Sequence, residues 1–244
     1  MNVLLHFISL WAIPLYGRQS KQGISITHLI DNFYVYTTWQ PINNAPFPSN
    51  SMYLVTDTGV VMFDTPWDST QFQPLLDSID ARHHKKVILC IATHFHDDRT
   101  AGIGFLKSKG IPTYSSQLTY NLCKAKDEKQ TQFFFSNDTV FHIGCYSFDI
   151  YYAGPGHTVD NIVIWFDKYK ILYGGCLIKS NQAKNLGNIA DANTTAWPVT
   201  IRKIIARFPH PKYIIPGHFG WTNGNALKHT LELLHKYART RKSL

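Results

Sequence analysis

The sequence predicts one layered α/β domain, and three observations lead to this fold class. Runs of β-branched and aromatic residues alternate with segments of helical periodicity along most of the chain. A length of 244 residues suits a single α/β domain with a substantial core. No internal repeat, Ser/Gly linker or low-complexity segment divides the chain. A layered arrangement of sheets and helices is therefore expected.

The expected elements follow one another closely. Strands are predicted over residues 24–38, 52–64, 87–92, 148–153, 161–166, 171–173 and 213–215. The turn Asp57-Thr58-Gly59 divides the second of these runs. Helices are predicted over residues 69–81, 100–109, 197–208 and 224–237. Residues 38–48, with three prolines, are expected to be a loop that joins two strands.

The first 17 residues resemble a secretory signal peptide, because the apolar run over residues 3–15 is too short to span a bilayer. No Lys or Arg precedes this run, and Leu15 rather than a small residue lies two places before the possible cleavage after Gly17. Despite these two departures from a typical signal peptide, we interpret residues 1–17 as a signal for export. The expected mature domain is residues 18–244, located in the periplasm, with no membrane anchor.

Charge and cysteine content narrow the function. The formal charge is +8, yet no dense basic run or aromatic-basic alternation indicates nucleic-acid binding, and the basic tail over residues 236–242 is short. A positive field would attract an anionic carboxylate substrate. Of the four cysteines, Cys90 is expected in the core, and Cys123 and Cys145 could pair in an oxidising compartment.

Metal-ligand residues follow predicted strands at several places. The segment Thr93-His94-Phe95-His96-Asp97-Asp98-Arg99 places two histidines and a carboxylate after the strand at 87–92. Histidine also follows two further strands, at His157 and His218, and Cys176 follows another. A lone histidine is more often a surface residue, and this chain has 12. Three strand ends that each deliver a histidine are hard to ascribe to chance, so six ligands are predicted.

These motifs resemble the metallo-β-lactamase superfamily, and within it the class B β-lactamases of the di-zinc subclass with a cysteine ligand. The resemblance spans residues 24 to 240. In related hydrolases such as glyoxalase II and the lactonases, a histidine stands where this chain has Arg99 and an aspartate where it has Cys176. Both departures favour the β-lactamase branch. The resemblance implies an αββα sandwich with the metal site at one edge between the two sheets.

The same resemblance implies a metal site with two Zn²⁺ ions. His94, His96 and His157 would hold the first ion. Asp98, Cys176 and His218 would hold the second. Six ligands thus divide into three plus three, which leaves each zinc a position for water or substrate. The implied reaction is hydrolysis of the β-lactam amide by a monomer without a covalent intermediate.

Further residues match the family by position. Lys179, three residues after Cys176, would bind the substrate carboxylate, and Asn188 would contact the substrate carbonyl, although a surface lysine and a turn former are the alternatives. Asp98 would orient the attacking hydroxide. Three aromatic side chains form a possible apolar lid over the substrate, with packing against the protein as an equal alternative: Trp39, Phe47 and Trp67.

Residues around the ligands have expected supporting roles. Asp64 is predicted either to orient a ligating imidazole or to cap the turn before Pro66. Arg99 is expected beneath the second metal, and Asp97 is expected to be structural. Two other functions stay open from the sequence: another superfamily hydrolase acting on a lactone, thioester or phosphodiester, and a secreted zinc-binding protein without catalysis.

Overall fold

The computed structural model describes residues 23–242, except residues 137 and 223. The predicted signal peptide, residues 1–17, lies outside this part. In the described residues, two sheets face each other. The first has the order β1-β2-β3-β4-β5-β6-β7, namely Ser25–Ile30, Phe33–Ile42, Ala45–Val55, Val60–Phe63, Val87–Ala92, Thr113–Ser116 and Phe133–Phe135. The second has the order β12-β11-β10-β9-β8, namely Tyr213–Pro216, Ile171–Gly175, Val163–Phe166, Tyr146–Tyr151 and Thr139–Ile143.

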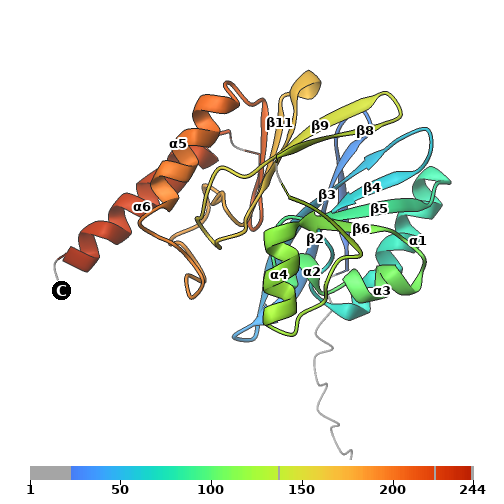
Figure 1. Ribbon diagram of the computed structural model, residues 1–244, viewed down its shortest axis with the longest axis horizontal. Helices are drawn as coiled ribbons and strands as arrows, with labels where there is room; N and C mark the ends of the chain where they lie inside the picture. Colours follow the sequence, from blue (N-terminus) through green and yellow to red (C-terminus); the bar gives the residue numbers. More distant parts are fainter. Residues whose placement is uncertain (1–22, 137, 223, 243–244) are drawn as a thin grey trace, which may run out of the picture.

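Helices cover the outer face of each sheet (Figure 1). Those of the first half of the chain are η1 (Ser69–Gln71), α1 (Phe72–His83), α2 (Asp97–Thr100), α3 (Ile103–Ser108) and α4 (Gln117–Ala125). Those of the second half are η2 (Asp167–Tyr169), α5 (Trp197–Arg207) and α6 (Ala226–Lys242). None of the described helices is long and apolar enough to cross a membrane.

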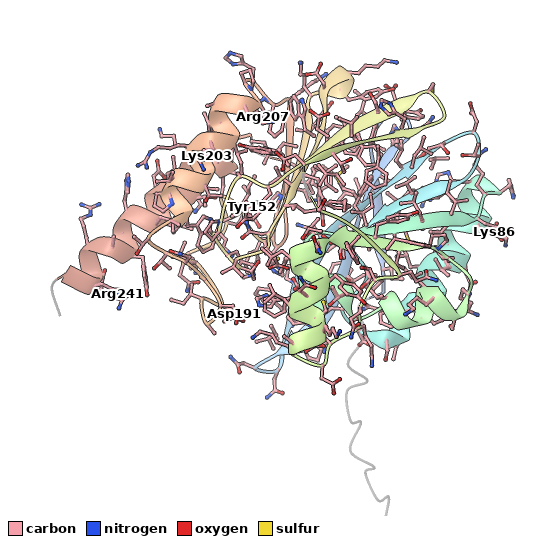
Figure 2. The ribbon with its side chains drawn as sticks, viewed as in Figure 1. Lys86, Tyr152, Asp191, Lys203, Arg207 and Arg241 are labelled. Carbon is pink, nitrogen blue, oxygen red and sulfur yellow. The ribbon has the colours of Figure 1, made fainter. Side chains whose placement is uncertain are left out.

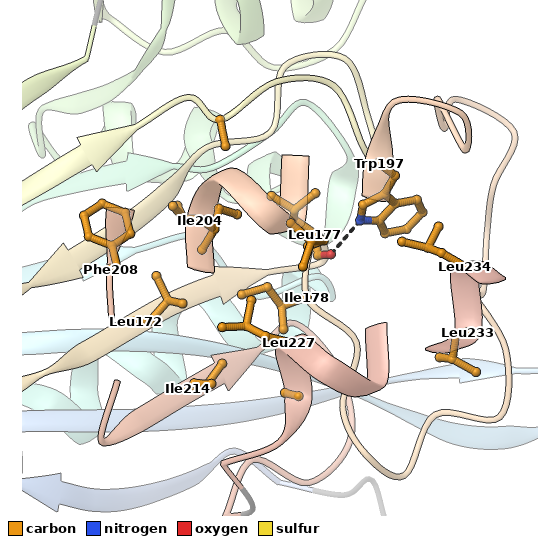
Figure 3. Close-up of a cluster of buried hydrophobic side chains, with 14 of the residues drawn as sticks. Leu172, Leu177, Ile178, Trp197, Ile204, Phe208, Ile214, Leu227, Leu233 and Leu234 are labelled. Atoms are coloured by element: carbon orange, nitrogen blue, oxygen red, sulfur yellow. Dashed lines mark hydrogen bonds between the residues drawn. The ribbon is translucent and has the colours of Figure 1, made fainter. Parts of the chain in front are cut away.

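The buried apolar side chains form three clusters that define the layers. One lies between the two sheets and includes Phe63 and Phe148, whose rings meet edge to face. A second lies under α1 and α3, and a third joins the smaller sheet to α5 and α6. In the third, the Trp197 indole donates a hydrogen bond to the Leu177 carbonyl oxygen (3.0 Å; Figure 3). The predicted αββα sandwich is therefore confirmed.

The β2–β3 hairpin corrects the prediction of a loop over residues 38–48. The two strands pair as far as Ile42 with Ala45, and Asn43 and Asn44 form the turn with φ of 50° and 62°. Asn tolerates this left-handed conformation. β1 pairs with β2 only up to Thr37, so the hairpin tip projects from the sheet as a two-stranded ribbon. Prolines are tolerated there because the outer edges have no neighbouring strand.

Other differences concern the boundaries of elements. Residues 24–38 form two strands rather than one, because the chain turns at Asp31 with φ of 44°. The segment β6-α4-β7 was not predicted from the sequence. Cys123 and Cys145 do not pair: both are free thiols, Cys123 buried in α4 and Cys145 exposed in the turn between β8 and β9.

Candidate metal centre and active site

Four strand ends meet at one edge between the sheets. The loop after β5 carries His94, His96 and Asp98, and the chain after β9 brings His157. Cys176 directly follows β11, and His218 lies two residues after β12, which pairs with β11 in parallel. The carboxyl ends of these two parallel strands therefore deliver their ligands to the same place. The six predicted ligands form three overlapping groups, and within each group the ligand atoms lie within 4.8 Å of one another: His94-His157-Cys176, His94-His96-Asp98 and Asp98-Cys176-His218.

The first cluster consists of three imidazoles. The ring centroids of His94, His96 and His157 lie 4.9 to 5.1 Å apart. His94 Nε2 and His157 Nδ1 are buried without a hydrogen-bond partner in the described structure. Burial lowers the pKa of His94 and of His157 well below its usual range, so both rings are neutral. Neutral rings with buried, unused nitrogens fit a metal ion such as zinc.

The second cluster consists of a carboxylate, a thiol and an imidazole. Cys176 Sγ lies 3.2 Å from Asp98 Oδ2 and 3.2 Å from His218 Nε2. His218 Nδ1 donates to the Pro48 carbonyl oxygen of the β2–β3 hairpin at 2.8 Å, because a carbonyl can only accept. This bond turns Nε2 toward the cluster. A mixed S, N and O donor set suits zinc.

Arg99 lies beneath the second cluster, as predicted. Its fully buried guanidinium donates to Cys176 Sγ and to the Gly217 carbonyl oxygen, both at 3.0 Å, and lies 3.1 Å from Asp98 Oδ2. Burial alone would raise the pKa of Asp98, but Arg99 and His218 hold it well below its usual range. A Cβ on Gly217 would lie 2.7 Å from Arg99 Nη2 and from Cys176 Sγ, so only glycine fits here.

Asp64 supports the metal loop in a way that differs from the prediction. Its carboxylate accepts hydrogen bonds from the backbone N–H and the hydroxyl of Thr93, at 2.7 and 2.9 Å, and from the Tyr173 hydroxyl. Its partners are thus the residue before His94 and the opposite sheet, rather than a ligating imidazole. Burial raises the pKa of Asp64 to about 6. Asp97 is exposed in the first turn of α2 and belongs to none of the described ligand groups.

Asp191 belongs to the site but was not predicted. Figure 2 labels Asp191. Its Oδ2 lies 3.0 Å from His96 Nε2, and its Oδ1 lies 3.1 Å from Lys126 Nζ at the end of α4. Hydrogen bonding to His96 lowers the pKa of Asp191, which keeps the carboxylate ionised. In the sequence, only the nearness of Asp191 to Asn188 pointed to the site. That nearness does not show that Asp191 contacts His96.

Lys179 and Asn188 occupy different environments. Lys179 is only 7% exposed, its ammonium lies 5.2 Å from the centre of the Trp197 ring, and no carboxylate of the described residues is within 4.0 Å of it. Burial lowers its pKa. Asn188 is exposed, and its Oδ1 accepts from the Ala190 N–H at 3.0 Å, so this side chain does form a turn. Its amide N–H₂ is directed to no described acceptor.

The predicted lid residues divide into two groups. Phe47, from the β2–β3 hairpin, lies with its ring centre 4.9 Å from that of His218 and 6.5 Å from that of Trp67. Phe47 and Trp67 therefore line one side of the second cluster. Trp39 pairs with Pro48 across the hairpin, and its carbonyl oxygen accepts from Gln71. Its indole is not among the rings around His218 in the described part of the chain.

Comparison with known proteins agrees with this geometry. The family model of the metallo-beta-lactamase superfamily matches residues 44–218. A metallo-beta-lactamase type 2 of Elizabethkingia meningoseptica is 39% identical over 97% of this chain and 94% of its own length. Metallo-beta-lactamase IND-1 of Chryseobacterium indologenes is 39% identical over 96% of this chain and 98% of its own length.

Solved structures give the same result. The crystal structure of metallo-beta-lactamase IND-7 matches with a TM-score of 0.85 and 41% identity, over 88% of this chain and 99% of that one. A metallo-beta-lactamase from Pontibacter korlensis matches with a TM-score of 0.84 and 35% identity, over 87% and 99% of the two chains. This chain therefore belongs to the metallo-beta-lactamase superfamily, and Cys176 fits its cysteine-ligand subclass.

Proposed function

We propose that this protein hydrolyses the amide bond of β-lactam antibiotics with two zinc ions and thereby confers resistance. The observation that carries the proposal is the close approach of six buried or half-buried side chains: three histidine rings lie 4.9 to 5.1 Å apart, and an Asp-Cys-His group that could hold a metal ion adjoins them. His94, His96 and His157 would hold one ion, and Asp98, Cys176 and His218 the other. When bound, such ions would supply Lewis acidity and would lower the pKa of a bound water from about 15.7 to near 7.

The chain's own groups prepare the reaction. Asp98, kept ionised by Arg99, would accept a hydrogen bond from the attacking water and so orient it toward the lactam carbonyl carbon. The free amide N–H₂ of Asn188 would donate to the carbonyl oxygen as negative charge develops there. Ring opening breaks the C–N bond, and the nitrogen takes up a proton from solvent. Net addition of one water balances the reaction.

Lys179 would bind the substrate carboxylate. Its ammonium lies in a buried environment without a carboxylate partner from the described residues, so an anionic ligand would gain a charged hydrogen bond there. Penicillins, cephalosporins and carbapenems all carry a carboxylate next to the strained amide. Phe47 and Trp67 would cover the apolar part of such a substrate, and Trp39 would contribute from the base of the hairpin.

We also propose that the protein is exported, with residues 1–17 as the signal peptide and residues 18–244 as a monomeric periplasmic domain. The support is the short apolar run at 3–15. Edman sequencing of the protein recovered from a bacterial periplasm would identify the cleavage point. An unprocessed N-terminus in the cytoplasmic fraction would contradict export.

The function is tested by metal analysis combined with turnover of a chromogenic cephalosporin. We expect two zinc ions per chain, loss of turnover on treatment with a chelator, and recovery on addition of zinc. A lactone and a thioester substrate serve as controls for the other superfamily hydrolases. A fully active preparation without metal would disprove the zinc mechanism, and a preference for the lactone or thioester would disprove the substrate class.

A further inference from the structure

The outer helical layer of the smaller sheet carries almost all the net charge of the protein. α5 and α6 contain eight Lys and Arg residues and one acidic residue, Glu232, a formal charge of +7 out of +8 for the whole chain. The basic residues are Arg202, Lys203, Arg207, Lys228, Lys236, Arg239, Arg241 and Lys242. The rest of the molecule is close to neutral, so its positive field is concentrated on one layer.

Two basic side chains of α5, those of Arg202 and Lys203, point away from the core. Trp197, Ile201 and Ile204 are buried against the smaller sheet. Arg202 and Lys203 are exposed and follow Val199 by three and four positions, so the three side chains adjoin one another on the outer side of the helix. Figure 2 shows Lys203, Arg207 and Arg241 along this outer layer, at the opposite end of the molecule from Lys86.

Little within the protein neutralises this layer. Among the described ion pairs, the only acidic residue of the two helices, Glu232, contacts Lys228 at 3.9 Å and His229 at 3.7 Å. No described carboxylate lies within 4.0 Å of Arg202, Lys203 or Lys236. These cations are therefore available to an anionic partner.

Apolar side chains lie among the cations. Val199 is 51% exposed and Ile205 is 41% exposed on α5. A phosphate backbone of nucleic acid would gain nothing from an exposed Val or Ile, since its contacts are with charged and hydrogen-bonding groups. A lipid interface takes both: basic side chains reach the headgroups while apolar side chains enter the boundary with the acyl chains.

We propose that the α5–α6 layer, defined by the eight basic residues above with Val199 and Ile205, binds peripherally to anionic phospholipid membranes. The metal clusters lie at the edge between the sheets, and α5 and α6 lie on the far side of the smaller sheet, so this binding is independent of β-lactam hydrolysis. Each Lys or Arg near an anionic surface contributes about fivefold to the binding constant, and the attraction weakens with salt.

Sedimentation with lipid vesicles tests this proposal. The purified protein is mixed with vesicles of phosphatidylcholine containing 30% phosphatidylglycerol, or with pure phosphatidylcholine, at low and at physiological salt. We expect binding to the anionic vesicles only, reduced by salt. The variant Arg202→Glu/Lys203→Glu should bind at least 25-fold more weakly, about fivefold for each lost cation, and repulsion of the two added carboxylates should weaken it further. Lys107→Glu/Lys109→Glu, in and directly after α3 in the opposite helical layer, makes the same change in net charge and should bind within about twofold of the wild type.

Thermal unfolding and turnover of the chromogenic cephalosporin establish that both variants are folded. Equal weakening by the two variants would show that net charge, and not this layer, is responsible, which would overturn the proposal. So would an absence of binding to anionic vesicles at low salt. Binding to a double-stranded DNA fragment is measured alongside the two kinds of vesicle. Tighter binding to DNA than to the vesicles, if it is lost in the Arg202→Glu/Lys203→Glu variant, would overturn the proposal and assign the layer to nucleic acid.

Discussion

The guanidinium of Arg99 donates a hydrogen bond to the sulfur of Cys176 at 3.0 Å, and both groups are buried. The same side chain faces Asp98 at 3.1 Å and Asp64 at 3.5 Å. One cation therefore connects the ligands of the second cluster to the carboxylate that holds the metal loop. Its fixed fork of donors is suited to several acceptors at once, which an ammonium group could not contact in the same geometry.

Replacement of Arg99 with Met should strongly destabilise the metal-free protein. The change leaves Asp98 and Asp64 buried without their cation, and loss of one partner of a buried ion pair costs about 3–5 kcal/mol. Urea denaturation of the metal-free protein measures the free energy of unfolding. Arg202→Met, at an exposed position of α5, is the control and should change it by about 0.5 kcal/mol or less. Similar small effects of both variants would show that Arg99 is not needed for the fold.

Asp191 should control the metal affinity of the first cluster. Its ionised carboxylate accepts from His96 Nε2–H, which leaves Nδ1 of that ring as the possible ligand atom. Asp191→Ala should weaken zinc binding at this cluster by about 10- to 100-fold, and Asp191→Asn less, since an amide oxygen still accepts. Competition with a chromophoric chelator measures the affinity. Asp167→Ala, which removes an exposed carboxylate distant in sequence, should leave it unchanged.

Lys179→Glu should raise KM for carboxylate-bearing substrates by about tenfold or more, because repulsion replaces a charged hydrogen bond of about 1.5–3 kcal/mol. Lys179 is buried, so the companion variant Lys179→Met removes the charge without adding a buried carboxylate. It should raise KM in the same direction with little change in thermal stability. Lys184→Glu, exposed on the same loop, is the control. An unchanged KM in Lys179→Met would contradict the assignment of the carboxylate site.

Metal binding at the second cluster should depend on pH through His218. Burial would lower the pKa of His218, but Cys176 and Asp98 outweigh it and raise the pKa to about 9 in the metal-free protein. A metal must displace this proton, so affinity should rise by at least about tenfold per pH unit from pH 7 to 9, and by more where the Cys176 thiol also gives up its proton to the metal. The first cluster, with His94 and His157 already neutral, should vary less over this range. Cobalt titrations at several pH values measure the metal affinity of each cluster and so separate the two pH dependences.

The effect of His218 on the stability of the metal-free protein has the opposite sign. A folded-state pKa above the unfolded value near 6.5 stabilises the fold fully below that value, and this stabilisation is lost as the pH rises through about 9. Urea midpoints of the metal-free wild type should therefore fall between pH 7 and 9. His218→Gln should abolish this part of the pH dependence; an unchanged slope would assign it to another group.

The strand ends and the family resemblance together pointed to six candidate ligands, and the structure brings these six side chains close to one another. His94, His157 and His218 come after apolar runs whose ends meet once the sheets form, so position in the chain indicated that these side chains lie together. Asp191 could not be found in this way, because it reaches His96 from a loop that has no regular spacing. The contact exists only after the loop is placed by Lys126 and by the packing of the third hydrophobic cluster.

The fold was predicted less completely than the ligands. Alternating strand and helix patterns located most elements, but β7 is a three-residue edge strand of consecutive phenylalanines, too short to show periodicity. The hairpin tip of β2 and β3 was interpreted as a loop because prolines usually interrupt strands. Its outer edges have no neighbouring strand, and this could be known only from the extent of β1 and β4. For both β7 and the hairpin tip, contacts with neighbouring strands determine the strand conformation, and the local sequence does not.

Cys176→Ser tests the feature that separates this chain from related hydrolases with an aspartate at this position. A serine hydroxyl is a far poorer zinc ligand than a thiolate, so the second metal should bind more weakly while the first cluster stays filled. The serine oxygen can still accept from Arg99, so the variant changes the metal ligand and keeps an acceptor at this position. If the second metal stabilises the departing nitrogen, kcat should fall by a larger factor than KM rises, because that charge exists mainly on the way to products.

Cobalt substitution makes the role of Cys176 visible without reference to activity. The wild type should show a strong near-ultraviolet charge-transfer band from sulfur to cobalt, and Cys176→Ser should lack it. Cys123→Ser is the matched control, since it removes another buried thiol that lies in none of the described ligand groups, and it should keep the band. Absence of the band in the wild type would make Cys176 an ordinary buried thiol whose sulfur serves only as an acceptor for Arg99, and the second cluster would then lack its third ligand.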